Sequence, residues 1–143
     1  MTGCYLDSNF LIYVKNEDAS QHVIATAKLK QLTAQEQSLY VSPLILDEFI
    51  HGFCTLIRIK TKINFSTVKQ VLKNILGLPR LEIINIPNDV RSQIRVLDLM
   101  QKYSLHARDA YHLITMQTNG IRNLATFDKD FDKVFSVKLL NKV

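Results

Sequence analysis

The chain has 143 residues, of which 47% are hydrophobic and 22% charged, and its 18 basic and 13 acidic side chains give a net charge of +5. The length suits one domain with a single core, and the composition excludes a disordered chain. No apolar run approaches the roughly 20 residues that span a bilayer, and no basic segment precedes an apolar run at the N-terminus. We therefore expect a single domain over residues 1–143, located in the cytoplasm, with no membrane partner.

Cysteine usage and net charge narrow the function classes further. Cys4 and Cys54 are too few for a disulfide framework, and no Cys or His pair has the spacing of zinc ligands. The excess of basic side chains is weak support for a polyanionic partner such as nucleic acid. The net charge becomes informative only together with an acidic pocket: basic side chains could then attract phosphates to a metal ion that the pocket holds.

The first half of the chain alternates short apolar segments with longer segments of helix-forming residues. We expect, in chain order, a strand at 4–6, helices at 10–15 and 19–37, a strand at 39–41 and a helix from residue 43. Ser42 and Pro43 are the residue types of an N-cap and a first helical position. Asp47 and Glu48 flank the apolar arc of that helix on opposite sides, and periodicity does not decide between them. Residues 55–64 fit either an extended basic segment or the frayed end of this helix.

The second half continues the alternation. We expect a helix capped by Ser66 that stops near residue 77, a strand at 81–86, a helix at 88–103, a helix from Ser104 to about residue 119, a strand at 123–126 and an edge strand at 137–140. The residues of the 88–103 helix expected to face inward are Val90, Ile94, Leu97 and Met100. Asp109 lies at the edge of an apolar arc, where an acid is costly without a partner or a metal.

This alternation predicts an α/β fold with a mostly parallel sheet that is covered by helices on both faces. Sites in such folds lie at the C-terminal ends of the strands. Asp7 and Asp128 directly follow strands, while Glu48 and Asp109 lie in the first turns of helices. We expect these four acids to reach the same edge of the sheet.

Four carboxylates at one site repel each other unless a cation joins them, and oxygen ligands suit Mg²⁺ or Mn²⁺. Such an ion can activate water and stabilise charge on a phosphate, as phosphodiester hydrolysis requires. Each acid also has an ordinary explanation: Asp7 as a helix cap, Glu48 as a solvated acid, Asp109 in an ion pair and Asp128 in a turn. Their shared placement favours the metal site.

Four segments together resemble the PIN domain family, including the toxin ribonucleases of VapBC toxin–antitoxin pairs. They span residues 5–13, 42–49, 107–113 and 125–131, in the order and at the spacing of that family. The resemblance implies a three-layer α/β/α sandwich and an endoribonuclease that depends on Mg²⁺ or Mn²⁺. It assigns the acids to Asp7, Glu48, Asp109 and Asp128, with Thr126 and Asn9 in support, and so resolves the choice between Asp47 and Glu48.

The resemblance also implies an RNA substrate, a protein antitoxin as partner and, as is common in the family, a homodimer. Two alternatives stay open: a PIN-like module that binds RNA or protein without cleaving, and a free-standing RNA-processing nuclease without an antitoxin.

Other residues near the motifs receive weaker assignments. We favour a structural or solvent-facing role for His112 over that of a general base. Arg108 fits a contact with RNA phosphate and a pair with a nearby acid equally well. Asp130 is expected to cap or to face solvent, and Asp132 is a weak candidate for assisting a second metal.

Overall fold

The computed structural model describes residues 3–143, and its five strands form one parallel sheet in the order β3-β2-β1-β4-β5. The strands are β1 (Gly3–Leu6), β2 (Ser38–Val41), β3 (Leu81–Ile83), β4 (Asn123–Ala125) and β5 (Asn141–Lys142). Tyr5 in the central strand lies opposite Tyr40 of β2 and Leu124 of β4. The predicted α/β fold with a parallel sheet is confirmed.

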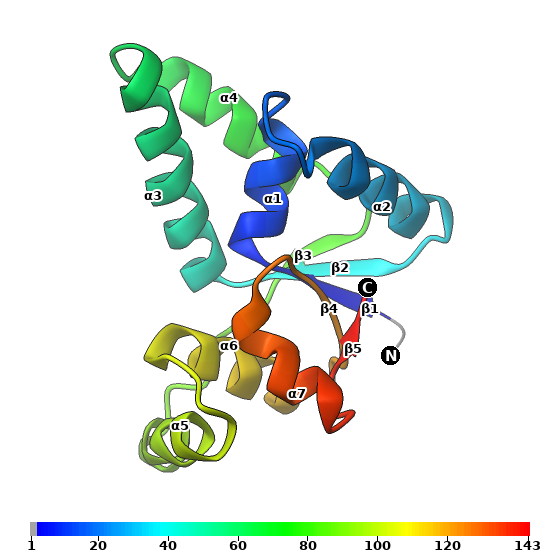
Figure 1. The fold of residues 1–143 in the computed structure, drawn as a ribbon, viewed down its shortest axis with the longest axis vertical. Helices are drawn as coiled ribbons and strands as arrows, with labels where there is room; N and C mark the ends of the chain where they lie inside the picture. Colours follow the sequence, from blue (N-terminus) through cyan, green and yellow to red (C-terminus); the bar gives the residue numbers. More distant parts are fainter. Residues whose placement is uncertain (1–2) are drawn as a thin grey trace.

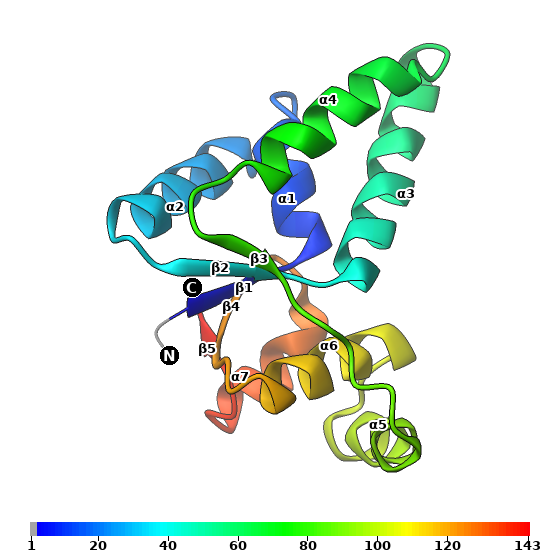
Figure 2. The same cartoon turned by 180° about the vertical axis from the view of Figure 1, so that it is seen from behind.

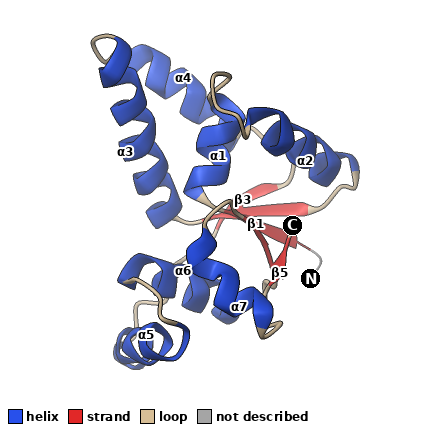
Figure 3. Cartoon of the chain, viewed as in Figure 1, coloured by secondary structure: helices blue, strands red, loops and turns tan. Residues whose placement is uncertain are grey.

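Helices cover both faces of this sheet, which gives the three layers of an α/β/α sandwich (Figures 1 and 3). The helices of one layer are α1 (Ser8–Lys15), α2 (His22–Ala34), α3 (Pro43–Lys60) and α4 (Phe65–Leu76). Those of the other layer are α5 (Val90–Tyr103), α6 (Ala107–Thr118) and α7 (Asp132–Ser136), preceded by a short 3₁₀ turn, η1 (Lys129–Phe131). The view from behind shows the same separation of the two layers (Figure 2). Within residues 3–143, no helix has the length and apolar character needed to cross a bilayer.

The centre of the sheet lies in the hydrophobic core. Cys4, Tyr5 and Leu6 of β1 are fully buried, as expected for a parallel strand covered on both faces. Leu113 and Ile114 of α6 belong to the same hydrophobic cluster as β1. This packing fixes β1 and α6 relative to each other. β1 ends directly before Asp7, and Asp109 lies in the first turn of α6.

The strand order reverses between the neighbouring strands β1 and β4. From β1 the sheet grows toward β2 and β3 on one side, whereas β4 returns to the other side of β1. Ligands of open α/β folds bind where the strand order reverses in this way. Asp7 and Thr126 directly follow these two strands, and the amide of Asp7 donates to the carbonyl of Ala125 (3.0 Å). The fold therefore brings the first and the last motif together.

Several predicted boundaries are wrong. The N-cap of α4 is Asn64, whose side chain accepts from the amides of Ser66 and Thr67. Ser104 does not start a helix; it ends α5 in the left-handed conformation (φ 54°). The edge strand lies at Asn141–Lys142, because residue 137 is the C-cap of α7 and residues 138–140 form the turn that follows it. Residues 55–60, left open from the sequence, continue α3.

The inward face of α5 is also predicted incorrectly. Val90, Ile94 and Leu97 are 79%, 61% and 61% exposed, and only Met100 of the predicted set is partly buried against the core. The buried residues are instead Val96, Leu99 and Tyr103. Both sets have helical spacing, so the pattern alone does not choose between them. The choice is made by α6, against which α5 packs.

Candidate functional site

Asp7 is a buried carboxylate held by three elements. It follows β1 and caps α1, accepting a hydrogen bond from the amide of Ser8 (2.7 Å). The hydroxyl of Thr126, just after β4, donates to its other oxygen (2.5 Å), and only 6% of Asp7 is exposed. The cap and the site are therefore not alternatives: Oδ1 accepts from the Ser8 amide while Oδ2 accepts from Thr126.

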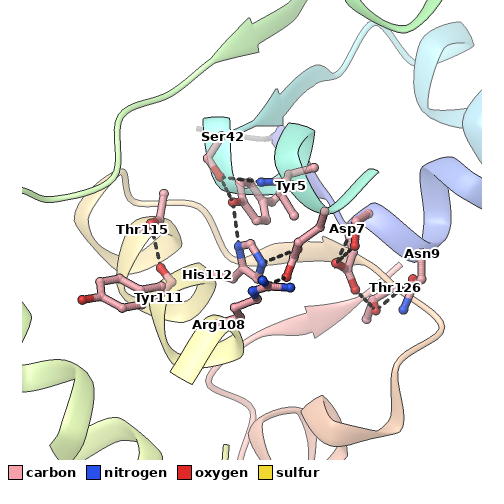
Figure 4. Close-up of polar contacts among 12 residues, drawn as sticks. Tyr5, Asp7, Asn9, Ser42, Arg108, Tyr111, His112, Thr115 and Thr126 are labelled. Atoms are coloured by element: carbon pink, nitrogen blue, oxygen red, sulfur yellow. Dashed lines mark hydrogen bonds and ion pairs between the residues drawn. The ribbon is translucent and has the colours of Figure 1, made fainter. Parts of the chain in front are cut away.

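Thr126 and Asn9, the two residues expected to support the acids, lie next to each other beside Asp7, and Thr126 is the one that contacts it (Figure 4). The Asn9 side-chain oxygen accepts from the amide of Phe127 (3.1 Å), which ties the start of α1 to the segment after β4. The Thr126 oxygen also accepts from the amide of Asp128 (2.9 Å). One hydroxyl thus contacts the carboxylate of Asp7 and the backbone of Asp128.

Glu48 faces the site and Asp47 faces solvent, which resolves on geometry the choice that periodicity leaves open. The Glu48 side chain is 15% exposed and comes from the second turn of α3, whose N-cap is Ser42. Its Oε2 accepts from Nε2 of His112 (2.9 Å), and its Oε1 lies 3.9 Å from Nε of Arg108. Of the two roles expected for Arg108, the pair with an acid is observed.

Asp109 and Asp128 meet on the other side of the site. Asp109 lies half-buried in the first turn of α6, and Asp128 caps η1 by accepting from the amide of Asp130 (2.9 Å). Asp130 is exposed, as expected, but it joins this pair. Asp132 is exposed on α7 and belongs to neither group of potential ligands found among residues 3–143.

The four predicted acids therefore fall into two groups of potential ligands. Asp7 and Glu48 group with His112, and Asp109 and Asp128 group with Asp130; within each group one ligand atom per residue lies within 4.8 Å of the others. The groups are electrostatically connected, because the charge of Asp7 raises the pKa of Asp109. The sequence places the acids at one edge but does not predict this division.

Burial and crowding raise the pKa of two of these carboxylates, Asp7 and Asp109. Burial raises the pKa of Asp7, with a further rise from Glu48, although the bond from Thr126 and the nearby His112 act in the opposite direction. Burial and then Asp128 raise the pKa of Asp109 to about 6. A divalent cation would offset both the burial of these acids and the repulsion between them, and sites built from carboxylate oxygens suit Mg²⁺ or Mn²⁺. The donor set fits such an ion.

His112 is the site residue that sequence reasoning underestimates. A structural role was one of the two expectations, but the solvent-facing alternative is wrong, because only 2% of the residue is exposed. Its partners, Glu48 and Tyr5, lie far away in sequence. The available signal was its position three residues after Asp109, on the largely buried helix α6.

Comparison with known proteins agrees with this fold. A family model described as the PIN domain matches residues 4–135. VapC20 of Mycobacterium tuberculosis, described as a toxin that cleaves the sarcin-ricin loop, superposes with a TM-score of 0.63 at 19% identity over 92% of this chain and 95% of that one. VapBC2 of Rickettsia felis, solved with a DNA fragment from its promoter, gives 0.66 at 18% identity over 98% and 96%. FitAcB of Neisseria gonorrhoeae gives 0.62 at 18% identity over 97% and 95%. No curated protein matches the sequence.

Proposed function

The chain belongs to the PIN domain family, and we propose that it is a metal-dependent endoribonuclease that hydrolyses RNA phosphodiester bonds. The observation that carries the proposal is the convergence of Asp7, Glu48, Asp109 and Asp128 on the C-terminal edge of the sheet, in two adjoining groups. The raised pKa values of Asp7 and Asp109 support it, because a site that crowds buried acids together suits a cation.

In this proposal the four acids hold one or two Mg²⁺ or Mn²⁺ ions. When bound, such an ion supplies activation of water for attack and stabilisation of the charge that develops on the phosphate. Thr126 and the amide of Ser8 keep Asp7 oriented. The Arg108 side chain is 61% exposed beside Glu48, where it is placed to bind a phosphate of the incoming RNA. In this proposal Arg108 combines the observed pair with Glu48 and a contact with RNA phosphate, which stays a prediction.

We further propose that the nuclease is the toxin of a type II toxin–antitoxin pair, with a protein antitoxin as partner, and that it acts in the cytoplasm, where its substrate is. The structural likeness to a protein described as an RNA-cleaving toxin supports this assignment. Val90, Ile94 and Leu97 form an exposed apolar row on α5 that is available to a protein partner, including a second copy of the chain.

The decisive experiment is cleavage of single-stranded and hairpin RNAs by the purified protein with Mg²⁺, with Mn²⁺ and with EDTA. Asp7→Asn, purified identically, controls for contaminating nuclease. We expect cleavage by the wild type alone, only with metal, leaving 5′-phosphate and 3′-hydroxyl ends. A folded wild type that neither cleaves any RNA nor binds metal in calorimetry contradicts the proposal and favours a PIN-like binding module.

A further inference from the structure

A buried chain of hydrogen bonds leads from the sheet to Glu48. Ser42 Oγ lies 2.7 Å from the hydroxyl of Tyr5, and that hydroxyl lies 3.1 Å from Nδ1 of His112 (Figure 4). Nε2 of the same imidazole lies 2.9 Å from Oε2 of Glu48. Ser42 and Tyr5 are fully buried. The catalytic proposal uses none of Ser42, Tyr5 and His112, although His112 hydrogen-bonds to Glu48, one of its acids.

The direction of each bond follows from the donors available. The Glu48 carboxylate only accepts, so Nε2 of His112 donates. A neutral imidazole that donates from Nε2 accepts at Nδ1, and the Tyr5 hydroxyl supplies that proton. Ser42 Oγ accepts from the amide of Ile45 (3.3 Å) and keeps its own proton for Tyr5. Every member of the hydrogen-bond chain then has a partner.

We propose that His112 is a positioning residue that holds the Glu48 carboxylate in its metal-binding orientation, with Tyr5 and Ser42 fixing the imidazole. The inference rests on the proposed function, in which Glu48 is a metal ligand. Glu48 has a long side chain whose contact with a charged group, Arg108, is largely exposed and 3.9 Å long. The bond from the buried His112 is therefore the contact that restricts it.

The same series of hydrogen bonds connects the elements that carry three of the acids. Tyr5 belongs to β1, which leads into Asp7; Ser42 caps α3, which carries Glu48; and His112 belongs to α6, which carries Asp109. Residues that hydrogen-bond to metal ligands typically contribute about 10–100-fold to metal affinity. We expect the connection to set the relative position of these elements before any metal binds.

A competing role for His112 is direct ligation, because Nε2 also lies within 4.8 Å of ligand atoms of Asp7 and Glu48. The two roles exclude each other: a nitrogen that donates its proton to Glu48 has no lone pair left for a cation. They differ in the spectrum of the bound ion. Electron spin-echo spectroscopy of the Mn²⁺-loaded protein should detect no directly coordinated nitrogen, and a nitrogen coupling of that kind overturns the positioning role.

A matched pair of substitutions tests the inference through Mn²⁺ affinity. The amide of His112→Gln reaches the place of Nε2 and keeps a donor for Glu48, whereas His112→Asn reaches only the place of Nδ1. We expect His112→Gln to bind Mn²⁺ within about threefold of the wild type and His112→Asn to bind about 10–100-fold more weakly. Saturating Mn²⁺ should restore much of the cleavage lost in His112→Asn, which a purely structural defect does not allow.

Two further variants keep the outcome interpretable if His112→Asn folds poorly. Tyr5→Phe removes one hydroxyl from a buried ring and should weaken Mn²⁺ binding to an intermediate degree. Arg108→Gln removes the cationic neighbour of Glu48 and should not weaken Mn²⁺ binding, whatever its effect on RNA binding. Equal affinities of His112→Gln and His112→Asn overturn the inference. A wild type that binds Mn²⁺ without cleaving RNA contradicts the proposed function alone, whereas a wild type that binds no Mn²⁺ contradicts both.

Discussion

The two groups of acids at the edge of the sheet are held in different ways. Asp7 and Glu48 are largely enclosed, and each accepts hydrogen bonds from buried or backbone donors. Asp128 and Asp130 are more open. The Asp128 carboxylate accepts from a backbone amide, and within residues 3–143 the ionic partner found for Asp130 is the exposed His106, at 3.8 Å. The protein thus arranges the first group by itself and leaves more of the second group's arrangement to a cation.

The difference follows from the elements that carry the two groups. Asp7 directly follows β1 and His112 belongs to α6, and these two elements share the central hydrophobic cluster, so the backbone at both residues is fixed by packing. In the second group Asp109 is also carried by α6, whereas Asp128 and Asp130 belong to the short segment around η1. Preorganised ligands bind without rearranging, whereas a crowded and open pair of acids gains more from the charge of the ion itself. We therefore expect substitutions in the first group to have larger effects on activity.

The largest effect is expected for Glu48→Gln, compared with its neighbour Asp47→Asn. The change at Glu48 removes a charge that faces the site, while the exposed Asp47 lies on the same helix turn. We expect Glu48→Gln to lower the rate of RNA cleavage by a factor on the order of 10³ and Asp47→Asn to change it by less than about twofold. A comparable loss in both variants means that the charge of α3 as a whole, and not the orientation of Glu48, matters.

In the second group, Asp128→Asn should have a smaller effect, and Asp130→Asn a smaller one still. Asp128 lies beside Asp109 and raises its pKa more than Asp130 does. We expect cleavage at limiting Mg²⁺ to fall roughly 10–100-fold for Asp128→Asn and only a few-fold for Asp130→Asn. Raising the Mg²⁺ concentration should recover part of each loss. If Asp128→Asn costs as much as Glu48→Gln, the two groups are equally important and the comparison fails.

How far the site can be predicted from sequence differs between these groups for physical reasons. Asp7 and Asp128 directly follow apolar segments, and a parallel sheet gathers the ends of its strands, so their placement at one edge follows from local patterns. The division into two groups depends on the directions of side chains. His112 could not be assigned because its partners, Glu48 and Tyr5, are 64 and 107 residues away.

The fold shows the same limit. The parallel sheet and the main helices follow from alternating segments, as in the confirmed strands β1 and β2. On α5, however, Val90 and Leu99 each belong to a row with helical spacing, and only the position of α6 decides which row is buried. Ser104 likewise is a good N-cap by residue type, but it adopts the left-handed conformation that ends a helix.

Thr126→Val tests whether the first group is held together without metal. The substitution keeps the shape of the side chain but removes the donor to Asp7 and the acceptor for the Asp128 amide. We expect the free energy of unfolding in EDTA to fall by about 1–3 kcal/mol, measured by urea titration. Thr126→Ser retains the hydroxyl and should recover most of this loss. Equal stability of the two variants argues against a preformed arrangement around Asp7.

The smallest effect is expected for Asp109→Asn in the absence of metal. The informative result is whether the substitution raises or lowers the free energy of unfolding. In the folded state the pKa of Asp109 is raised from 3.8 to about 6. As pH rises from about 4 to about 6, the unfolded chain has already lost this proton while the folded protein still holds it. The free energy of unfolding of the wild type therefore decreases across that window and stays lower above it.

Asp109→Asn removes this cost, so in EDTA at pH 7.5 the variant should be more stable than the wild type by about 1 kcal/mol. This figure is smaller than the full pKa shift would give, because solvent screens the half-exposed acid. The difference should disappear near pH 4. With Mg²⁺ the order should reverse, because the wild type gains the stabilisation of a bound ion and the variant gains less. Thermal unfolding across pH, with EDTA and with Mg²⁺, measures all three. A variant that is less stable than the wild type in EDTA at pH 7.5 means that Asp109 makes a structural contact stronger than its repulsion, and that the second group, too, is arranged without metal.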